Sequence, residues 1–68
     1  MLLKLGNKIR YERMRKSLSQ EELAERANIN MRSVSTIECG ITDIKFTTLT
    51  KIAEALGVET TSLIDFRL

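Results

Sequence analysis

The stretch LSQEELAERANINMRSVSTIECG, from Leu18 to Gly40, decides the fold of this chain. Ser19 is a favourable helix N-cap, and Glu22 stands three residues later. The two complete a capping box, in which each side chain binds the backbone amide of the other residue. The apolar residues that follow recur at helical spacing. The pattern predicts a short helix that begins after Ser19 and runs to about Ala27.

Residues 28–30 separate this helix from the next one. Asparagine is the best residue after glycine for the left-handed conformation that ends a helix abruptly, and Asn28 stands where that conformation is needed. Asn30 is in turn a good N-cap for a third helix, which runs from about 31 to 39 before Gly40 stops it. The sequence therefore predicts two helices joined by a tight corner.

The third predicted helix has two unlike flanks. At 100° per residue, one flank holds Val34, Ile37 and Glu38, with Met31 at its margin. The opposite flank is short and polar and holds Arg32, Ser33 and Thr36, with Ser35 and Cys39 at its edge. The first flank is predicted to pack on the core and the second to face outward. Two such helices around a three-residue corner describe a helix-turn-helix, whose second helix fits the DNA major groove.

The remaining helices are placed by apolar spacing. Leu2, Leu5 and Ile9 predict a first helix over about 3–16. After a loop, a fourth helix is predicted over about 46–56, and Gly57 ends it. Its inward-facing residues are predicted to be Phe46, Leu49, Ile52, Ala53 and Leu56. A fifth helix over about 60–65 buries Leu63. The chain is expected to form one all-α domain over 1–68, with a core of about 5–64, the helix-turn-helix at about 20–39 and a tail at 65–68.

Composition narrows the function classes. The 68 residues include one cysteine and no histidine or proline, which leaves no plausible zinc site and no histidine-activated nucleophile. We expect no enzyme, no cofactor and no small-molecule ligand. The sequence lacks an apolar run long enough for a membrane span and lacks a signal peptide, so a cytoplasmic, nucleoid-associated protein is expected. Residues 1–16 carry six basic side chains against Glu12. This basic end suits a polyanion partner, although charge alone favours a solvated helix face.

The chain resembles the lambda Cro/cI repressor-type (XRE-type) helix-turn-helix domain from about residue 5 to residue 64. The residues that carry the resemblance are Leu5-Gly6, Ile9-Arg10, Arg13, LSQEELA (18–24), Asn30, Val34-Ser35, Ile37-Glu38, Gly40, Leu49, Ile52-Ala53 and ALGV (55–58). The resemblance implies a compact five-helix bundle. It also implies a sequence-specific regulator of transcription that binds double-stranded DNA, as a homodimer of the repressor type on a near-palindromic operator.

The resemblance also assigns roles to residues. Base contacts fall on Arg32, Thr36, Ser33 and Met31. Phosphate contacts fall on Gln20, Ser19 (through its hydroxyl or its amide), Arg10 and Lys45, with Thr42 or Thr47 as further candidates. Arg13 and Glu38 are expected to form a structural salt bridge, which agrees with the inward flanks on which both lie.

Several alternatives stay open at this level. Met31 is either a core residue or a base contact. Leu63, Ile64, Phe66 and Leu68 form either core or a dimer seam, and the last two favour the seam. The same fold can also serve as a protein-interaction module, as in coactivators or antitoxins, through this apolar C-terminal surface. The sequence departs from the family pattern at Asn28, where relatives have glycine, at Glu12, and in the loop 41–45, which holds one acidic and one basic residue.

Overall fold

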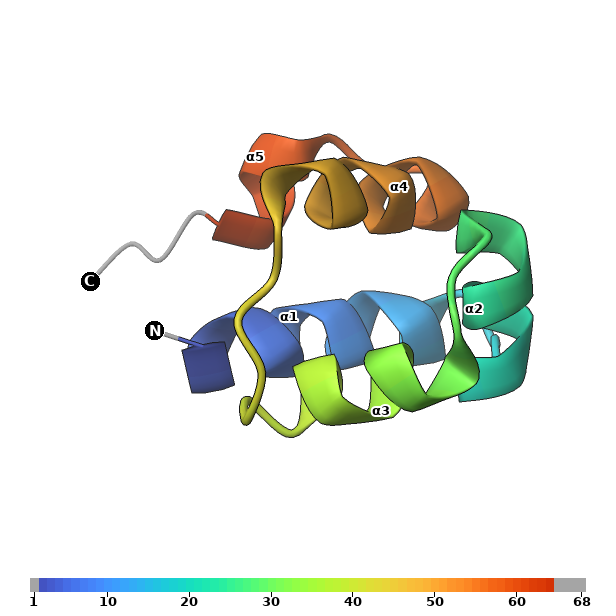
Figure 1. The fold of residues 1–68 in the computed structure, drawn as a ribbon. Coiled ribbons are helices and arrows are strands. Elements are labelled where there is room, and N and C mark those ends of the chain that lie inside the picture. Colours follow the sequence, from blue (N-terminus) through green and yellow to red (C-terminus); the bar gives the residue numbers. More distant parts are fainter. Residues whose placement is uncertain (1, 65–68) are drawn as a thin grey trace.

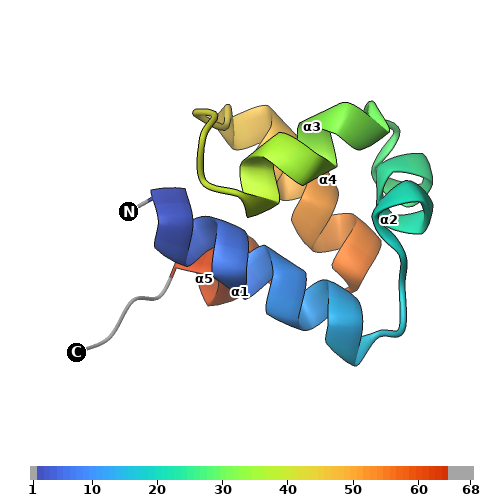
Figure 2. The same cartoon turned by 90° about the horizontal axis from the view of Figure 1, so that it is seen from below.

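The computed structural model describes residues 2–64, which form five helices and contain no strand. They are α1 (Leu2–Arg15), α2 (Gln20–Ala27), α3 (Met31–Glu38), α4 (Phe46–Leu56) and α5 (Thr60–Ile64). Figure 1 shows α1 and α3 along the lower side, α4 and α5 along the upper side, and α2 standing at the right-hand end. From below, α3 lies beside α1, with α4 and α5 behind them (Figure 2). The predicted all-α class and the helix order are confirmed.

The capping box at the start of α2 is present. The Ser19 hydroxyl accepts the backbone N–H of Glu22 at 3.0 Å, and the Glu22 carboxylate accepts the backbone N–H of Ser19 at 2.9 Å. Both partners satisfy amides that a helix N-terminus otherwise leaves without an intrahelical acceptor. The sequence alone therefore placed this helix start correctly.

The corner between α2 and α3 also has its predicted geometry. Asn28 adopts the left-handed conformation, with φ 56° and ψ 46°. The backbone N–H of Ile29 donates to the Ala24 carbonyl at 2.9 Å, which closes the end of α2. Two residues after Asn28, the side chain of Asn30 accepts a hydrogen bond from the backbone N–H of Arg32 at 2.7 Å and caps the start of α3. The stop of one helix and the start of the next are thus fixed within three residues, and this fixes the direction in which α3 leaves α2.

The core follows the predicted apolar spacing, with one correction. The completely or nearly completely buried side chains are Leu5, Ile9, Leu18, Leu23, Ala24, Ala27, Val34, Ile37, Leu49, Ile52, Ala53, Leu56 and Leu63. Phe46 was predicted to point inward and is instead 68% exposed. It is the first residue of α4, and because side chains tilt toward the N-terminus of their helix, a side chain at this position extends away from the body of the helix. The prediction for Phe46 is wrong for this reason.

Gly6 brings α1 into direct backbone contact with the end of α3. A Cβ at this position would lie 2.5 Å from the carbonyl oxygen of Ile37 and 2.6 Å from that of Glu38. Both neighbours are backbone atoms, so they cannot move aside as a flexible side chain would. The two helices can approach this closely only because residue 6 has no side chain.

Replacing Gly6 with alanine is therefore expected to lower the free energy of unfolding by about 1–3 kcal/mol through overpacking. Helix propensity alone would change stability in the opposite direction, by about 1 kcal/mol. Urea unfolding followed by circular dichroism measures the difference. Asn7→Ala, at the exposed neighbouring position, is the control and should raise stability slightly through helix propensity. A Gly6→Ala protein as stable as the wild type would contradict the close contact.

The capping box makes stability depend on pH in a defined direction. The backbone N–H of Ser19, which donates to Glu22, lowers the pKa of Glu22 below its ordinary value. A carboxyl group with a lowered folded-state pKa stabilises the fold above its unfolded pKa, which is about 4.3, and loses that contribution as pH falls through the folded pKa.

We therefore expect Glu22→Gln to be less stable than the wild type at pH 7, and we expect this difference to shrink as the pH falls below about 4. Urea unfolding curves of both proteins between pH 2.5 and 7 measure it. Glu25→Gln, on the same helix and outside the cap, should show a smaller and flatter difference. A gap between wild type and Glu22→Gln that stays constant over the whole pH range would rule out the carboxylate as its source.

Candidate nucleic-acid interface

The two flanks of α3 differ in burial as the sequence predicts. On the inner flank Val34, Ile37 and Glu38 are 1%, 5% and 5% exposed. On the outer flank Arg32 is exposed, and Ser33 and Thr36 are half-buried. Met31 is 50% exposed, so of its two alternatives the structure excludes the buried core position. Three of the eight residues of α3 are therefore buried against the core, and the other five are exposed or half-buried and available to a partner.

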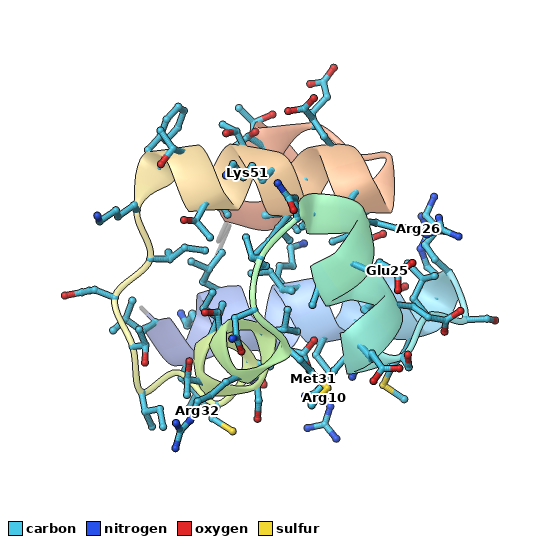
Figure 3. The ribbon with its side chains drawn as sticks, turned by 45° about the vertical axis from the view of Figure 1, so that its right-hand side comes forward. Arg10, Glu25, Arg26, Met31, Arg32 and Lys51 are labelled. Atoms are coloured by element: carbon cyan, nitrogen blue, oxygen red, sulfur yellow. The ribbon has the colours of Figure 1, made fainter. Side chains whose placement is uncertain are left out.

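Figure 3 shows where the exposed residues of α3 point. Met31 and Arg32 project from the lower side of the molecule, and Arg10 of α1 projects on the same side. Glu25 and Arg26 of α2 point to the right-hand side instead (Figure 3). Two arginines from separate helices thus reach out on the side of α3, whereas the acidic Glu25 does not.

The Thr36 hydroxyl has a backbone partner within its own helix. Its Oγ1 donates to the Ser33 carbonyl at 3.1 Å. A hydroxyl whose hydrogen is engaged in this way keeps its oxygen lone pairs as acceptors. In this arrangement Thr36 can offer a partner an acceptor and its methyl group, which suits an exocyclic amino group or a thymine methyl on a base edge.

A shallow groove of about 270 Å³ adjoins the outer flank of α3. Its wall is formed by Ser33 and Thr36 of α3, by Thr42 and Lys45 of the connecting loop, and by Thr48 of α4, with Asp43 at the same site. Lys45 is also the N-cap of α4, and within the part of the chain that the structure describes no side chain hydrogen-bonds to that N-terminus. The groove thus combines hydroxyls, an ammonium group and open helix amides, which favour an anionic group. The Asp43 carboxylate opposes such a group, and Ile37 and Ile44 add an apolar part to the lining.

The first residue of α2 meets the end of α3. The Gln20 side-chain nitrogen donates to Glu38 Oε1 at 3.2 Å, and Gln20 is half-buried. The amide of Ser19 is already engaged with Glu22 in the capping box. The family resemblance offered two groups of Ser19 for phosphate binding, the hydroxyl and the amide. In the structure the amide hydrogen is engaged, and the hydroxyl hydrogen is free to donate to a phosphate.

The predicted salt bridge between Arg13 and Glu38 is present. Arg13 Nε lies 2.6 Å from Glu38 Oε2, and Arg13 Nη2 lies 3.0 Å from Glu38 Oε1. The two side chains are 12% and 3% exposed, so the pair is shielded from water. The hydrogen bonds and the negative charge of Glu38 raise the pKa of Arg13 above its ordinary value, although burial acts in the opposite direction. This pair belongs to the buried side of α3, away from the exposed outer flank.

A helix-turn-helix family model matches residues 9–63. The chain belongs to the XRE-type helix-turn-helix family. The control protein C.BamHI of Bacillus amyloliquefaciens is 38% identical over 65 residues, which cover 94% of this chain and 80% of that protein. The crystal structure of the restriction-modification controller protein C.AhdI of Aeromonas hydrophila superimposes with a TM-score of 0.90 and 34% identity, covering 91% of this chain and 94% of the other. The clp gene regulator ClgR of C. glutamicum gives a TM-score of 0.87 and 25% identity, covering 93% and 82%.

The C-terminal surface of this helix-turn-helix protein is only partly described. Leu63 is 0% exposed and packs inside its own chain. Of the two alternatives left open for this residue, core or dimer seam, the structure therefore shows the core. Ile64 is 39% exposed. Phe66 and Leu68, the other residues assigned to the seam, lie outside the described residues. Across residues 2–64, no helix has the length and apolar character needed to cross a membrane.

Two features of this helix-turn-helix site were missed at the sequence level. The hydrogen bond from Gln20 to Glu38 joins residues 18 positions apart, and no local pattern signals it. The groove beside α3 depends on how the loop 41–45 packs against α4, which the sequence leaves undetermined. The sequence did show one sign of the groove, because Lys45 directly before a predicted helix is a poor N-cap that leaves helix amides open.

Proposed function

We propose that this protein is a sequence-specific regulator of transcription that binds double-stranded DNA with α3 in the major groove. The observation that carries the proposal is the division of α3, whose buried flank fixes the helix on the core while its polar flank is exposed beyond a tight corner. A helix presented in this way fits a groove about 12 Å wide. Membership of the XRE-type helix-turn-helix family supports the same function.

The base contacts that we propose come from the outer flank. Arg32 is the main reader, because a guanidinium can donate two hydrogen bonds to the O6 and N7 atoms of guanine. Thr36 contributes an acceptor and a methyl group, and Ser33 and the exposed Met31 extend the contact along the groove. The absence of a long side chain at Ser33 and Thr36 lets the helix backbone come close to the base edges.

The phosphate contacts that we propose surround α3. Gln20 and the Ser19 hydroxyl lie at the start of α2, and Lys45 lies at the start of α4. Arg10 projects from the same lower side of the molecule as Met31 and Arg32 in Figure 3. Such contacts fix the position of the protein on the duplex without reading sequence. The open N-terminus of α4 adds backbone donors next to Lys45.

We further propose that two copies bind a near-palindromic operator, one half-site per subunit. A single recognition helix reads only a few base pairs, and a symmetric dimer doubles both the contacts and the length of the site. The similarity to the control protein C.BamHI and to the restriction-modification controller protein C.AhdI favours a role as the controller of a restriction-modification system.

The test is a selection of binding sites from a random duplex pool, followed by titration of the selected duplex at several salt concentrations. We expect a consensus with two-fold symmetry and an affinity that falls steeply with salt, because each neutralised phosphate releases counterions. A selection without any enrichment, with weak binding to all duplexes alike, would contradict the proposed function. The C-terminal surface would then be the first place to look for a protein partner.

A further inference from the structure

The start of α2 is held by a buried carboxylate from the end of α3. Glu38 Oε2 accepts a hydrogen bond from Arg13 Nε, and Glu38 Oε1 accepts one from Arg13 Nη2 and one from Gln20 Nε2. Arg13 Nη1 also donates to the backbone carbonyl of Leu18, two residues before Gln20, at 2.7 Å. One ion pair therefore fixes both the chain entering α2 and the side chain of its first residue.

The orientation of the Gln20 amide follows from this contact. A carboxylate can only accept hydrogen bonds, so the nitrogen of Gln20 and not its oxygen must face Glu38. One amide hydrogen is donated to Glu38, and the second remains for another acceptor. A glutamine side chain that is free in solution loses rotamer freedom when it is ordered, which reduces an affinity by about tenfold. In this protein Glu38 restricts the side chain before any partner arrives.

We propose that Glu38, held by Arg13, is a positioning residue for DNA binding, because it orients the Gln20 amide toward a backbone phosphate. The inference rests on the proposed function, in which Gln20 contacts a phosphate. It assigns the buried ion pair a second role besides stability, since the pair prepares a contact on the surface. Neither Arg13 nor Glu38 touches DNA.

The test separates positioning from stability with a double-mutant cycle. Arg13→Met with Glu38→Leu replaces the ion pair by an apolar pair, a change that is often neutral or stabilising when both charges are removed together. Gln20→Met removes the amide and keeps the side-chain length. Affinity is measured for the duplex that the wild-type protein selects, on variants whose thermal unfolding shows them to be folded. We expect Gln20→Met to weaken binding about tenfold and the apolar pair to weaken it about fivefold.

The informative value is the effect of the apolar pair in the Gln20→Met background. If the ion pair acts through Gln20, its removal there should change affinity less than about twofold. An equal loss in both backgrounds means that the pair acts on DNA binding only through the general structure and overturns the inference. Wild-type affinity for Gln20→Met also overturns it while leaving the proposed function intact. A wild-type protein that selects no duplex overturns both.

A second measurement uses the wild-type protein and needs no folded variant. Gln20 is the only glutamine in the chain, so selective ¹⁵N labelling gives one side-chain NH₂ group in the NMR spectrum. We expect this group to be restricted in the free protein and to shift when the selected duplex is added. An order parameter below about 0.6 in the free protein would mean a freely moving side chain and would overturn the inference.

Discussion

Arg32→Ala is expected to weaken binding to the selected operator by about 5- to 150-fold for each half-site, and to leave folding unchanged. A two-pronged contact to guanine contributes about 1–3 kcal/mol of discrimination, and tenfold in affinity corresponds to about 1.4 kcal/mol. Arg32 is exposed on α3, and its backbone N–H, which caps against Asn30, is retained in alanine. The stability of the variant should therefore match that of the wild type.

Affinities for two duplexes, the selected operator and a scrambled one, separate base recognition from general electrostatic attraction. Arg32→Ala should lose affinity mainly for the selected operator. Its affinity for a scrambled duplex should fall only by the contribution that one positive charge makes to nonspecific binding. Arg26→Ala is the matched control, because it removes the same charge from an exposed position that points away from Arg32 in Figure 3. Equal losses from the two variants on both duplexes would show that Arg32 contributes charge and not base recognition.

Glu38→Ala is expected to lower the free energy of unfolding by about 3–5 kcal/mol, the range for removing one partner of a buried ion pair. The substitution leaves the shielded guanidinium of Arg13 without its carboxylate and removes the acceptor of Gln20. A chain of this size has a small stability reserve, so a large fraction of the variant should be unfolded at 37 °C. Thermal and urea unfolding of Glu38→Ala, Arg13→Ala and the double variant measure the effect and the coupling between the two residues.

An exposed ion pair provides the comparison. Arg15 Nε lies 3.2 Å from Glu12 Oε1, and the two side chains are 55% and 15% exposed, against 12% and 3% in the buried pair. Arg15→Ala should change stability by less than about 1 kcal/mol, as surface pairs usually do. A coupling energy near zero between Arg13 and Glu38, or an Arg15→Ala effect as large as that of Glu38→Ala, would show that burial does not give the first pair its importance.

The parts of the fold that could be predicted from sequence are those decided within a few residues. The capping box of Ser19 and Glu22, the left-handed Asn28 and the N-cap Asn30 each depend on local hydrogen bonds, and all three are present. Gly40 and Gly57 also have the positive φ angles expected of helix stops. The Arg13–Glu38 pair was implied by the family resemblance, and the inward flanks of both residues agreed with it.

The parts that could not be predicted depend on how distant segments meet. Ser17 takes a left-handed conformation, with φ 57°, although serine rarely does so, and the turn is closed by the Leu18 amide donating to the Arg13 carbonyl. The sequence pattern placed Phe46 inside because spacing ignores where a helix begins relative to the core. The contact of Gln20 with Glu38 has no local sequence signal either, because it joins the start of one helix to the end of another.

The separation of α3 into a buried flank and an exposed flank has a consequence for how such regulators diverge. The residues that hold α3 on the core and the residues that face outward lie on different flanks of one helix. Under the proposed function, a substitution at Arg32, Ser33 or Thr36 is therefore expected to alter target preference with little effect on stability. Under the same proposal, a lineage is expected to explore new operators by single steps while Val34, Ile37 and Glu38 stay constant. The same separation allows an engineer to transplant the outer residues of a relative onto this scaffold as an independent module.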